Sequence, residues 1–143
     1  MRILLGIDDS PHSKAAIEYV KTTAWPKGTH VIALSAAAPV FVGPGEAAAP
    51  MVIEQINAGQ LAYHRSLAEA AASELRAAGL TAEGRWPVGD PRHALLEAAE
   101  GEKANLIVLG SHGRSGISKL LIGSVASHVV THAHCNVLVV KKP

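Results

Sequence analysis

A strand-like run that leads directly into a glycine-rich loop constrains this chain more than any other feature. The run NLIVL at 105–109 consists mostly of branched apolar residues, a pattern typical of a strand buried on both faces of a parallel sheet. The stretch GSHGRSGISKLLIGS follows at 110–124 and leads into an apolar segment with helical periodicity. Glycine lets a backbone approach a ligand closely, and the N–H groups at a helix start favour negative charge. This order of elements predicts a phosphate-binding site.

The spacing of the glycines differs from that of the commonest phosphate loops. The Walker pattern G-x-x-x-x-G-K-[ST] is absent because Lys119 does not follow a glycine, and no G-x-G-x-x-G dinucleotide pattern is present. The serine-nucleophile pattern G-x-S-x-G also fails, since Ser115 is followed directly by Gly116. The pattern that fits is G-x2-G-x9-G-[ST], formed by Gly110, Gly113, Gly123 and Ser124.

This pattern resembles the ATP-binding signature of the universal stress protein family. Three further stretches resemble the family in its order: LGIDDS at 5–10, VGDP at 88–91 and VLVVK at 137–141. The resemblance covers nearly the whole chain and implies one universal stress protein domain over 1–143. It also implies a nucleotide-dependent regulatory or sensor module in the stress response, with ATP as its ligand, with or without Mg²⁺. The sequence leaves ADP, AMP and cyclic nucleotides open as alternatives to ATP.

Strand-like runs alternate with helix-like runs along the chain. We expect strands at 2–7, 29–37, 81–88, 105–109 and 136–141, and helices at 11–23, 51–78, 91–100 and 121–132. This alternation predicts an α/β, Rossmann-like fold, a single doubly wound sheet of five parallel strands with helices on both faces. The family resemblance implies the strand order 3-2-1-4-5. In that order Asp8 and Gly110 lie at the carboxyl ends of neighbouring strands, where such sheets bind ligands.

Local patterns predict how individual elements begin, end and face the core. Ser10 is expected to cap the first helix with proline next to it, and Gly79 to end the second helix. Pro87 predicts that the third strand lies at an edge, and residues 38–50 read as a long loop, either a lid or a surface segment. The side chains expected to face the core are Ala15, Ala16, Tyr19 and Val20 in the first helix and Ile53, Ile56, Leu67, Ala71 and Leu75 in the second.

The family resemblance assigns roles to several residues. Asp8 corresponds to an aspartate beside the adenosine and would bond base or ribose, while Asp9 is the better helix cap of the two. Ala36 corresponds to a position whose backbone meets adenine. His112 and Arg114 can meet phosphate charge, although both also fit a solvated loop. The full set expected to bind nucleotide is Ile7, Asp8, Ala36, Leu109, Gly110, His112, Gly113, Arg114, Gly123, Ser124 and Val125.

Neither a metal site nor a catalytic centre is predicted. His128 and His132 are four residues apart, with His134 and Cys135 beyond, and such spacing can bind zinc. However, no carboxylate or second cysteine lies nearby, and histidines are favoured at helix C-termini in any case. Fast phosphoryl transfer needs a nucleophile, a catalytic cation and metal-holding carboxylates. Around the loop the chain offers N–H groups, a serine and a histidine, which allow slow ATP hydrolysis at most.

Charge, hydropathy and cysteine content argue against a nucleic-acid partner and against a membrane or secreted location. Lys and Arg total 13 against 12 acidic residues, so no basic surface for nucleic acid is expected. No run of ~18 apolar residues predicts a membrane span, and the first residues are too short for a signal segment. A single cysteine suits a reducing compartment. We therefore expect a cytoplasmic protein.

The last strand predicts a homodimer, and two other functions compete with nucleotide binding. Residues 136–141 are apolar on both faces, yet the order 3-2-1-4-5 leaves them at a sheet edge that can pair with a second copy. A dimeric scaffold of the same family without nucleotide is one alternative. A phosphorelay receiver domain is the other, but it needs an aspartate at the end of its third strand, and the nearest is Asp90.

Overall fold

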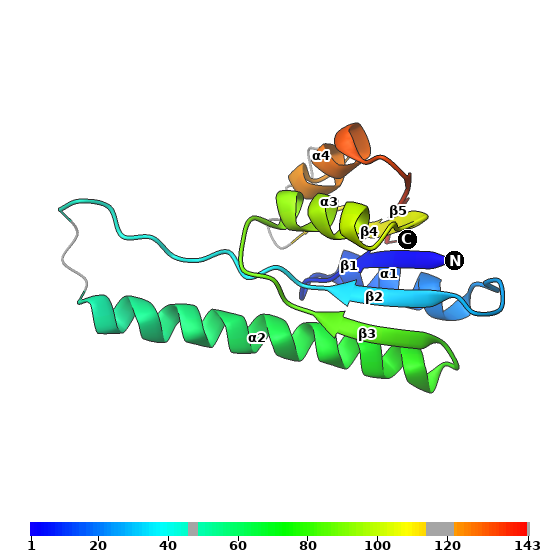
Figure 1. Ribbon diagram of the computed structural model, residues 1–143, viewed down its shortest axis with the longest axis horizontal. Helices are drawn as coiled ribbons and strands as arrows, with labels where there is room; N and C mark the ends of the chain where they lie inside the picture. Colours follow the sequence, from blue (N-terminus) through cyan, green and yellow to red (C-terminus); the bar gives the residue numbers. More distant parts are fainter. Residues whose placement is uncertain (46–48, 114–121, 143) are drawn as a thin grey trace.

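The computed structural model describes residues 1–45, 49–113 and 122–142, and in these it forms one parallel five-stranded sheet with four helices (Figure 1). The order β3-β2-β1-β4-β5 confirms the predicted fold. The strands are β1 (Arg2–Gly6), β2 (His30–Leu34), β3 (Thr81–Arg85), β4 (Leu106–Gly110) and β5 (Asn136–Val140). The helices are α1 (Pro11–Thr22), α2 (Pro50–Ala77), α3 (Pro91–Gly101) and α4 (Ser124–His132).

Four of the five strands are shorter than predicted, mainly at their carboxyl ends, while β4 keeps the predicted length and is shifted by one residue. β2 and β3 leave the regular ladder after Leu34 and Arg85, although Ala37 and Val88 still pair through an isolated bridge. The predicted fourth helix was to begin at 121, a residue outside the described ranges, and α4 begins at Ser124. The strand predicted at 105–109 is β4, which lies beside the central strand β1.

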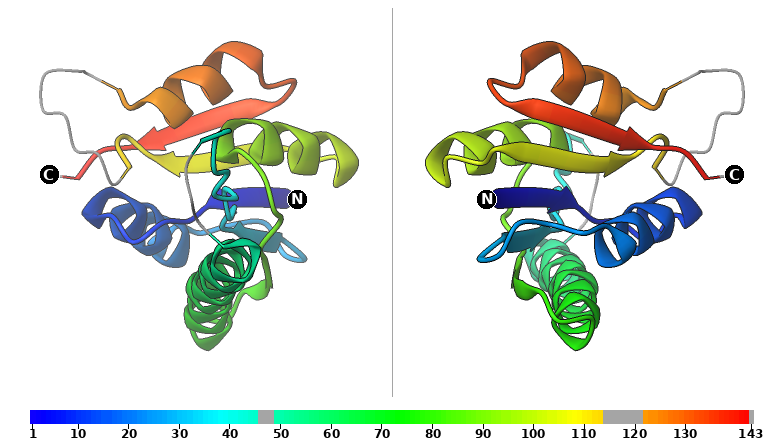
Figure 2. Two further views of the ribbon diagram at one scale, coloured as in Figure 1. Left: turned by 90° about the vertical axis from the view of Figure 1, so that its left-hand side faces the viewer. Right: turned by 90° about the vertical axis from the view of Figure 1, so that its right-hand side faces the viewer.

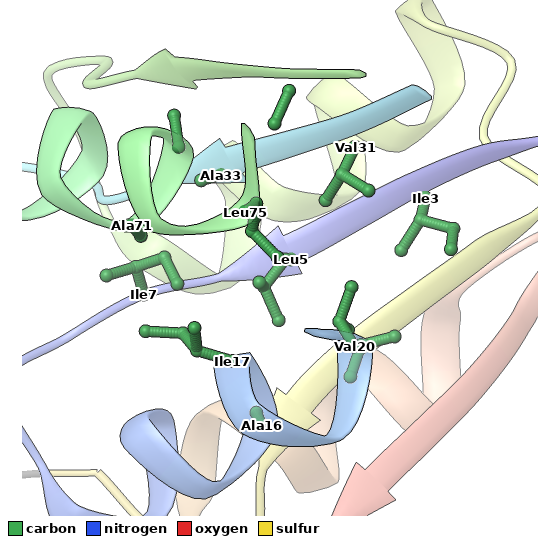
Figure 3. Close-up of a cluster of buried hydrophobic side chains, with 13 residues drawn as sticks. Ile3, Leu5, Ile7, Ala16, Ile17, Val20, Val31, Ala33, Ala71 and Leu75 are labelled. Atoms are coloured by element: carbon green, nitrogen blue, oxygen red, sulfur yellow. The ribbon is translucent and has the colours of Figure 1, made fainter. Parts of the chain in front are cut away.

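Helices cover both faces of the sheet, with α1 and α2 on one face and α3 and α4 on the other (Figure 2). Side chains alternate along β1, so that Ile3 and Leu5 pack under α1 and α2 while Leu4 packs under α3 and α4. Figure 3 shows the first of these two cores, where Val20 and Leu75 approach the strands. Burial on both faces explains why β1, β2 and β4 are apolar at most positions, whereas the edge strand β3 (sequence TAEGR) is largely polar.

The ends of the helices follow the sequence signals. Ser10 caps α1, and its Oγ accepts a hydrogen bond from the Ser13 N–H at 3.1 Å. Gly79 has a φ of +89° and closes α2, because its N–H bonds Arg76 O at 2.9 Å and the next N–H, of Leu80, bonds Leu75 O at 3.1 Å.

Two predicted core residues are exposed. Tyr19 is 41% exposed on α1, and Ile56 is 43% exposed on α2. The buried residues of α2 lie between Ala68 and Leu75. The first half of this helix projects beyond the carboxyl ends of the strands (Figure 1), so it has no sheet against which Ile56 can pack. The apolar periodicity of α2 therefore predicted the buried residues correctly only in the second half of the helix.

The second half of α2 lies close against β3. A Cβ atom added at Gly84 would come within 2.9 Å of the Ala68 backbone, so this glycine permits the close approach of helix and strand. β3 is an edge strand, as predicted from Pro87, which follows it. In the described ranges, no helix has the length and apolar character needed to cross a membrane.

Candidate functional site

The described ends of the glycine-rich loop meet each other beyond the carboxyl end of β4. The Gly123 N–H donates to Ser111 O at 2.6 Å, which brings the start of α4 beside the residues that follow β4. Gly123 occupies the N-cap position of α4 with extended backbone angles (φ −70°, ψ 165°). The N–H groups of the first turn of α4 therefore start next to the loop, where an anion is favoured.

The loop after β1 lies against the same place. Asp8 Oδ1 accepts a hydrogen bond from the Ser10 N–H at 2.9 Å, and the Asp8 N–H donates to Ser13 Oγ at 3.1 Å. A Cβ atom at Gly113 would lie 3.0 Å from Asp8 Oδ2, so this glycine leaves room for the carboxylate. The predicted capping role of Asp9 is wrong. Ser10 caps the helix, and the Asp9 carboxylate accepts a hydrogen bond from the Tyr63 hydroxyl at 2.6 Å.

These loops open into a cavity of about 440 Å³ at the carboxyl ends of β1, β2 and β4. Its size falls within the range of small-molecule sites. Ten of the eleven residues expected to bind nucleotide line it, and the eleventh, Arg114, lies outside the described residues. The ten are Ile7, Asp8, Ala36, Leu109, Gly110, His112, Gly113, Gly123, Ser124 and Val125.

The cavity has a further wall on α2 that the sequence did not reveal. Gln60 and His64 line it from the helix, and Val40 lines it from the segment after β2. Asn57 holds that segment, because its Oδ1 accepts from the Val40 N–H at 2.8 Å. His64 Nδ1 lies 2.8 Å from Oγ of the buried Ser35. No local pattern marks these residues, because their roles depend on where α2 passes over the ends of the strands.

A second hydrogen-bonded cluster that was not predicted supports the glycine loop. The buried Ser111 hydroxyl lies between two imidazoles, 3.1 Å from His12 Nδ1 and 3.2 Å from His112 Nδ1. The ring centroids of the two histidines are 5.0 Å apart. A hydroxyl has one proton, so at most one of the two ring nitrogens can accept it, and a nitrogen that does not accept must donate to Ser111 Oγ. This cluster links α1 to the backbone on which His112 stands.

A charged pair lies at the start of α3, the helix whose Pro91 and Leu95 line the cavity. Asp90 caps this helix, and hydrogen bonds from the Arg92 side chain hold the pKa of its carboxyl well below the usual range. Asp90 therefore stays ionised at neutral pH and compensates the Arg92 charge. Among the described lining residues of the cavity, Asp8 is the one carboxylate.

The histidines whose spacing could bind zinc are not among the described lining residues of the cavity. The His128 and His132 rings stack with centroids 4.2 Å apart, and His93 meets His128 edge-on at 5.7 Å. Desolvation, followed by the repulsion of His132, lowers the pKa of His128. Burial raises the pKa of the Cys135 thiol, which opposes a role as nucleophile. In the parts of the chain that the structure describes, no group of three or more potential ligands could hold a metal ion.

Comparison with known protein families identifies the family to which this chain belongs. Residues 1–141 match the model of the universal stress protein family. The chain belongs to this family. The receiver-domain alternative is wrong, because receivers have the strand order 2-1-3-4-5 and this sheet has the order 3-2-1-4-5.

Two relatives illustrate how the match varies in extent. The "universal stress protein in QAH/OAS sulfhydrylase 3′ region" of Thermus aquaticus is 35% identical over 97% of both chains. Universal stress protein MJ0531 of Methanocaldococcus jannaschii is 53% identical over 55 residues, which cover 38% of this chain and 32% of that protein. The similarity thus extends along nearly the whole chain in one relative and over about a third of the other.

Solved structures share the fold. The MJ0577 protein of Methanocaldococcus jannaschii superposes with a TM-score of 0.79 at 26% identity, covering 99% of this chain and 96% of that one. A universal stress protein in complex with cAMP superposes with a TM-score of 0.64 at 28% identity, covering 99% and 96%. An Arabidopsis thaliana family member with AMP bound has a TM-score of 0.67 at 16% identity, covering 100% and 92%, and shows likeness of fold alone.

Proposed function

We propose that this universal stress protein binds ATP in the cavity at the carboxyl ends of β1, β2 and β4 and acts as a nucleotide-dependent regulatory or sensor module. One observation carries the proposal. Residues predicted to bind nucleotide from four separate stretches of sequence line a single cavity of about 440 Å³. Two solved members of the fold carry adenine nucleotides, one cAMP and one AMP, which supports the choice of ligand class.

The phosphates would lie at the glycine-rich end of the cavity. Gly113 and Gly123 carry no side chain there, and an added Cβ would be 3.0 Å from Asp8 Oδ2 at the first and 3.2 Å from Ser111 O at the second. The start of α4 contributes backbone N–H groups and the Ser124 hydroxyl, which suit phosphate oxygens. His112 lines the same end and can contribute a ring N–H as a further donor.

The adenosine would extend away from the loop toward β2 and α2. Ile7 and Ala36, which follow β1 and β2, are buried apolar residues that line the cavity, and a flat base suits such walls. The backbone of Ala36 is the proposed contact for adenine. Asp8 stands between the two ends and would accept a hydrogen bond from base or ribose. Apolar walls with a few polar groups favour a nucleoside over a sugar phosphate.

The described lining residues suit binding better than rapid turnover. Asp8 is their one carboxylate, and its Oδ1 already accepts from Ser10, so Mg²⁺ would be held mainly by the ATP phosphates and water. No lysine lines the cavity within the described ranges. We therefore infer that hydrolysis of bound ATP, where it occurs, is slow.

Replacing Asp8 with Asn tests this assignment. The Asn carbonyl can still accept from the Ser10 N–H, so the turn before α1 should persist while the charge is lost. We expect ATP binding to weaken by about 1–3 kcal/mol, the range for loss of a charged hydrogen bond. Calorimetric titration of both proteins with ATP measures this change, and slow turnover of bound ATP should continue.

The outcomes of that test separate the alternatives. Unchanged ATP affinity in the Asp8→Asn protein would remove Asp8 from the site, and loss of hydrolysis with normal binding would make it a catalytic or metal-holding residue. If the unaltered protein binds no ATP, the scaffold alternative replaces the proposal. Mass spectrometry of nucleotide released by heat denaturation would distinguish ATP from ADP, AMP and cyclic nucleotides.

We also propose that the protein forms a homodimer through β5. This strand is at the sheet edge, and its apolar side chains from Val137 to Val140 pack against the two cores. Among the described residues, only β4 pairs with it. Pairing with its own copy across a two-fold axis would satisfy the N–H and C=O groups of the other edge in both copies.

Light scattering on the purified protein at micromolar concentration should give twice the chain mass of 14.8 kDa. The physical reason is the outer edge of β5, with which no other described strand pairs and which offers a regular row of backbone hydrogen-bonding groups to a second copy. A uniform species of 14.8 kDa would contradict the dimer. It would leave the nucleotide proposal untouched, because the lining residues given for the cavity contain none from β5.

A further inference from the structure

The contact between Ser35 and His64 orients an imidazole ring that lines the cavity. Ser35 follows β2, is fully buried, and its Oγ lies 2.9 Å from Ile7 O and 2.8 Å from His64 Nδ1. His64 stands on α2 and lines the cavity. A hydroxyl has a single proton to donate, so a partner that can only accept fixes the direction of both hydrogen bonds.

The carbonyl of Ile7 can only accept a hydrogen bond, so the Ser35 proton must point to it. The second partner, His64 Nδ1, must then donate its own proton to Ser35 Oγ. In the neutral ring the Nδ1–H tautomer places the lone pair on Nε2. The backbone at the end of β1 thus sets the tautomer of a histidine on α2, and it makes Nε2 of this ring a hydrogen-bond acceptor.

The position of His64 in the cavity indicates what this acceptor would meet. Residues 110–113 and the start of α4 line the cavity on the β4 side of β1, and Gln60, His64 and the segment after β2 line it on the β2 side. A ligand with its phosphates on the loop extends its nucleoside toward β2, where Ser35 precedes Ala36. His64 bonds this Ser35, so its ring belongs to the nucleoside end of the cavity.

We propose that His64 is a specificity-determining residue that accepts a hydrogen bond from a donor group of the nucleoside, held in the accepting tautomer by Ser35. This inference rests on the proposed nucleotide binding and adds a recognition residue from α2. Two groups of ATP supply the required chemistry, the 6-amino group of adenine and the ribose hydroxyls. A keto group at position 6 of the base has no proton to donate and would face the lone pair of Nε2 unfavourably.

The test compares ATP with analogues that lack one donor each. Inosine triphosphate replaces the 6-amino group with a keto group, and 2′-deoxy-ATP and 3′-deoxy-ATP each lack one hydroxyl. The unaltered protein should bind ATP about three- to tenfold more tightly than at least one of these, the range expected for one hydrogen bond. The analogue that loses affinity identifies the donor.

His64→Phe keeps a ring of similar shape without nitrogen. In this variant ATP should bind only as tightly as the weaker-binding analogue does, because the hydrogen bond to His64 is lost. The affinity for that analogue, which never made this hydrogen bond, should change by no more than about twofold. The ligand change and the mutation thus form a double-mutant cycle that isolates this one interaction. Ser35→Ala keeps the imidazole but frees its tautomer, so it should reduce the same preference to a smaller extent. His134→Phe, at an exposed histidine before β5, is the matched control and should leave the preference unchanged.

The outcomes distinguish this inference from the proposed function. If the unaltered protein binds none of the nucleotides, nucleotide binding itself fails. If it binds ATP but His64→Phe retains the full preference over every analogue, or if no preference exists, the role of His64 is overturned and nucleotide binding stands. Circular dichroism of each variant checks folding, and Ser35→Ala provides the decision if His64→Phe does not fold.

Discussion

Gly123→Val is expected to abolish ATP binding while the domain remains folded. The backbone at 123 is extended (φ −70°, ψ 165°), a conformation that valine adopts without strain. An added Cβ would lie 3.2 Å from both Ser111 O and His112 Cα, so the branched side chain must push the two ends of the loop apart. The N–H groups of the first turn of α4 would then leave the positions in which they meet phosphate.

Calorimetry with ATP measures the loss, and a thermal melt followed by circular dichroism measures folding. Gly101→Val is the matched control, since Gly101 ends α3 with no atom within 4 Å of an added Cβ. A folded Gly123→Val protein that binds ATP as tightly as the control would exclude the glycine-rich loop as the phosphate site.

Gly110→Ala is expected to destabilise the whole domain. A Cβ atom at this position would lie 2.6 Å from the carbonyl carbon and 2.7 Å from the oxygen of His12. These are backbone atoms in the first turn of α1, so no side chain can rotate away, and α1 must shift off the end of β4. We expect a loss of about 3 kcal/mol in the free energy of unfolding, at the upper end of the range for overpacking.

Urea denaturation gives this free energy directly. Gly101→Ala, where an added Cβ meets open space, should change it by a small amount and serves as the control. If the two variants unfold at the same urea concentration, the close approach of α1 to β4 at Gly110 does not limit stability. The structural reason for glycine at this position would then be the ligand alone.

The pattern of the chain predicted much of the fold, because strands and helices have different apolar periods. Continuous apolar runs such as 105–109 indicated strands covered on both faces, and their alternation with helices requires a parallel sheet. Ser10 and Gly79 marked helix ends through local geometry, which needs no distant partner. The strand order came from the family resemblance, and periodicity alone does not give it.

Errors occurred where a residue's surroundings depend on the arrangement of whole elements. Tyr19 and Ile56 follow the apolar period of their helices, yet both are exposed. Ile56 lies in the half of α2 that projects beyond the sheet. A periodic pattern tells which side of a helix is apolar, and it does not tell how much of the helix a neighbour covers.

Most motif residues of the candidate site could be predicted from the sequence, because they lie at the carboxyl end of a strand or at the start of the helix that follows the glycine-rich loop. The carboxyl ends of neighbouring parallel strands meet at one edge, so Asp8 and Gly110 had to approach once the order was known. The Ser35–His64 pair was not accessible in this way. Its members are 29 residues apart, and their contact depends on the path of α2 along β3 and β2 and beyond their carboxyl ends. Local sequence determined the elements and their ends, and only tertiary packing decided which side chain of a long helix enters the cavity.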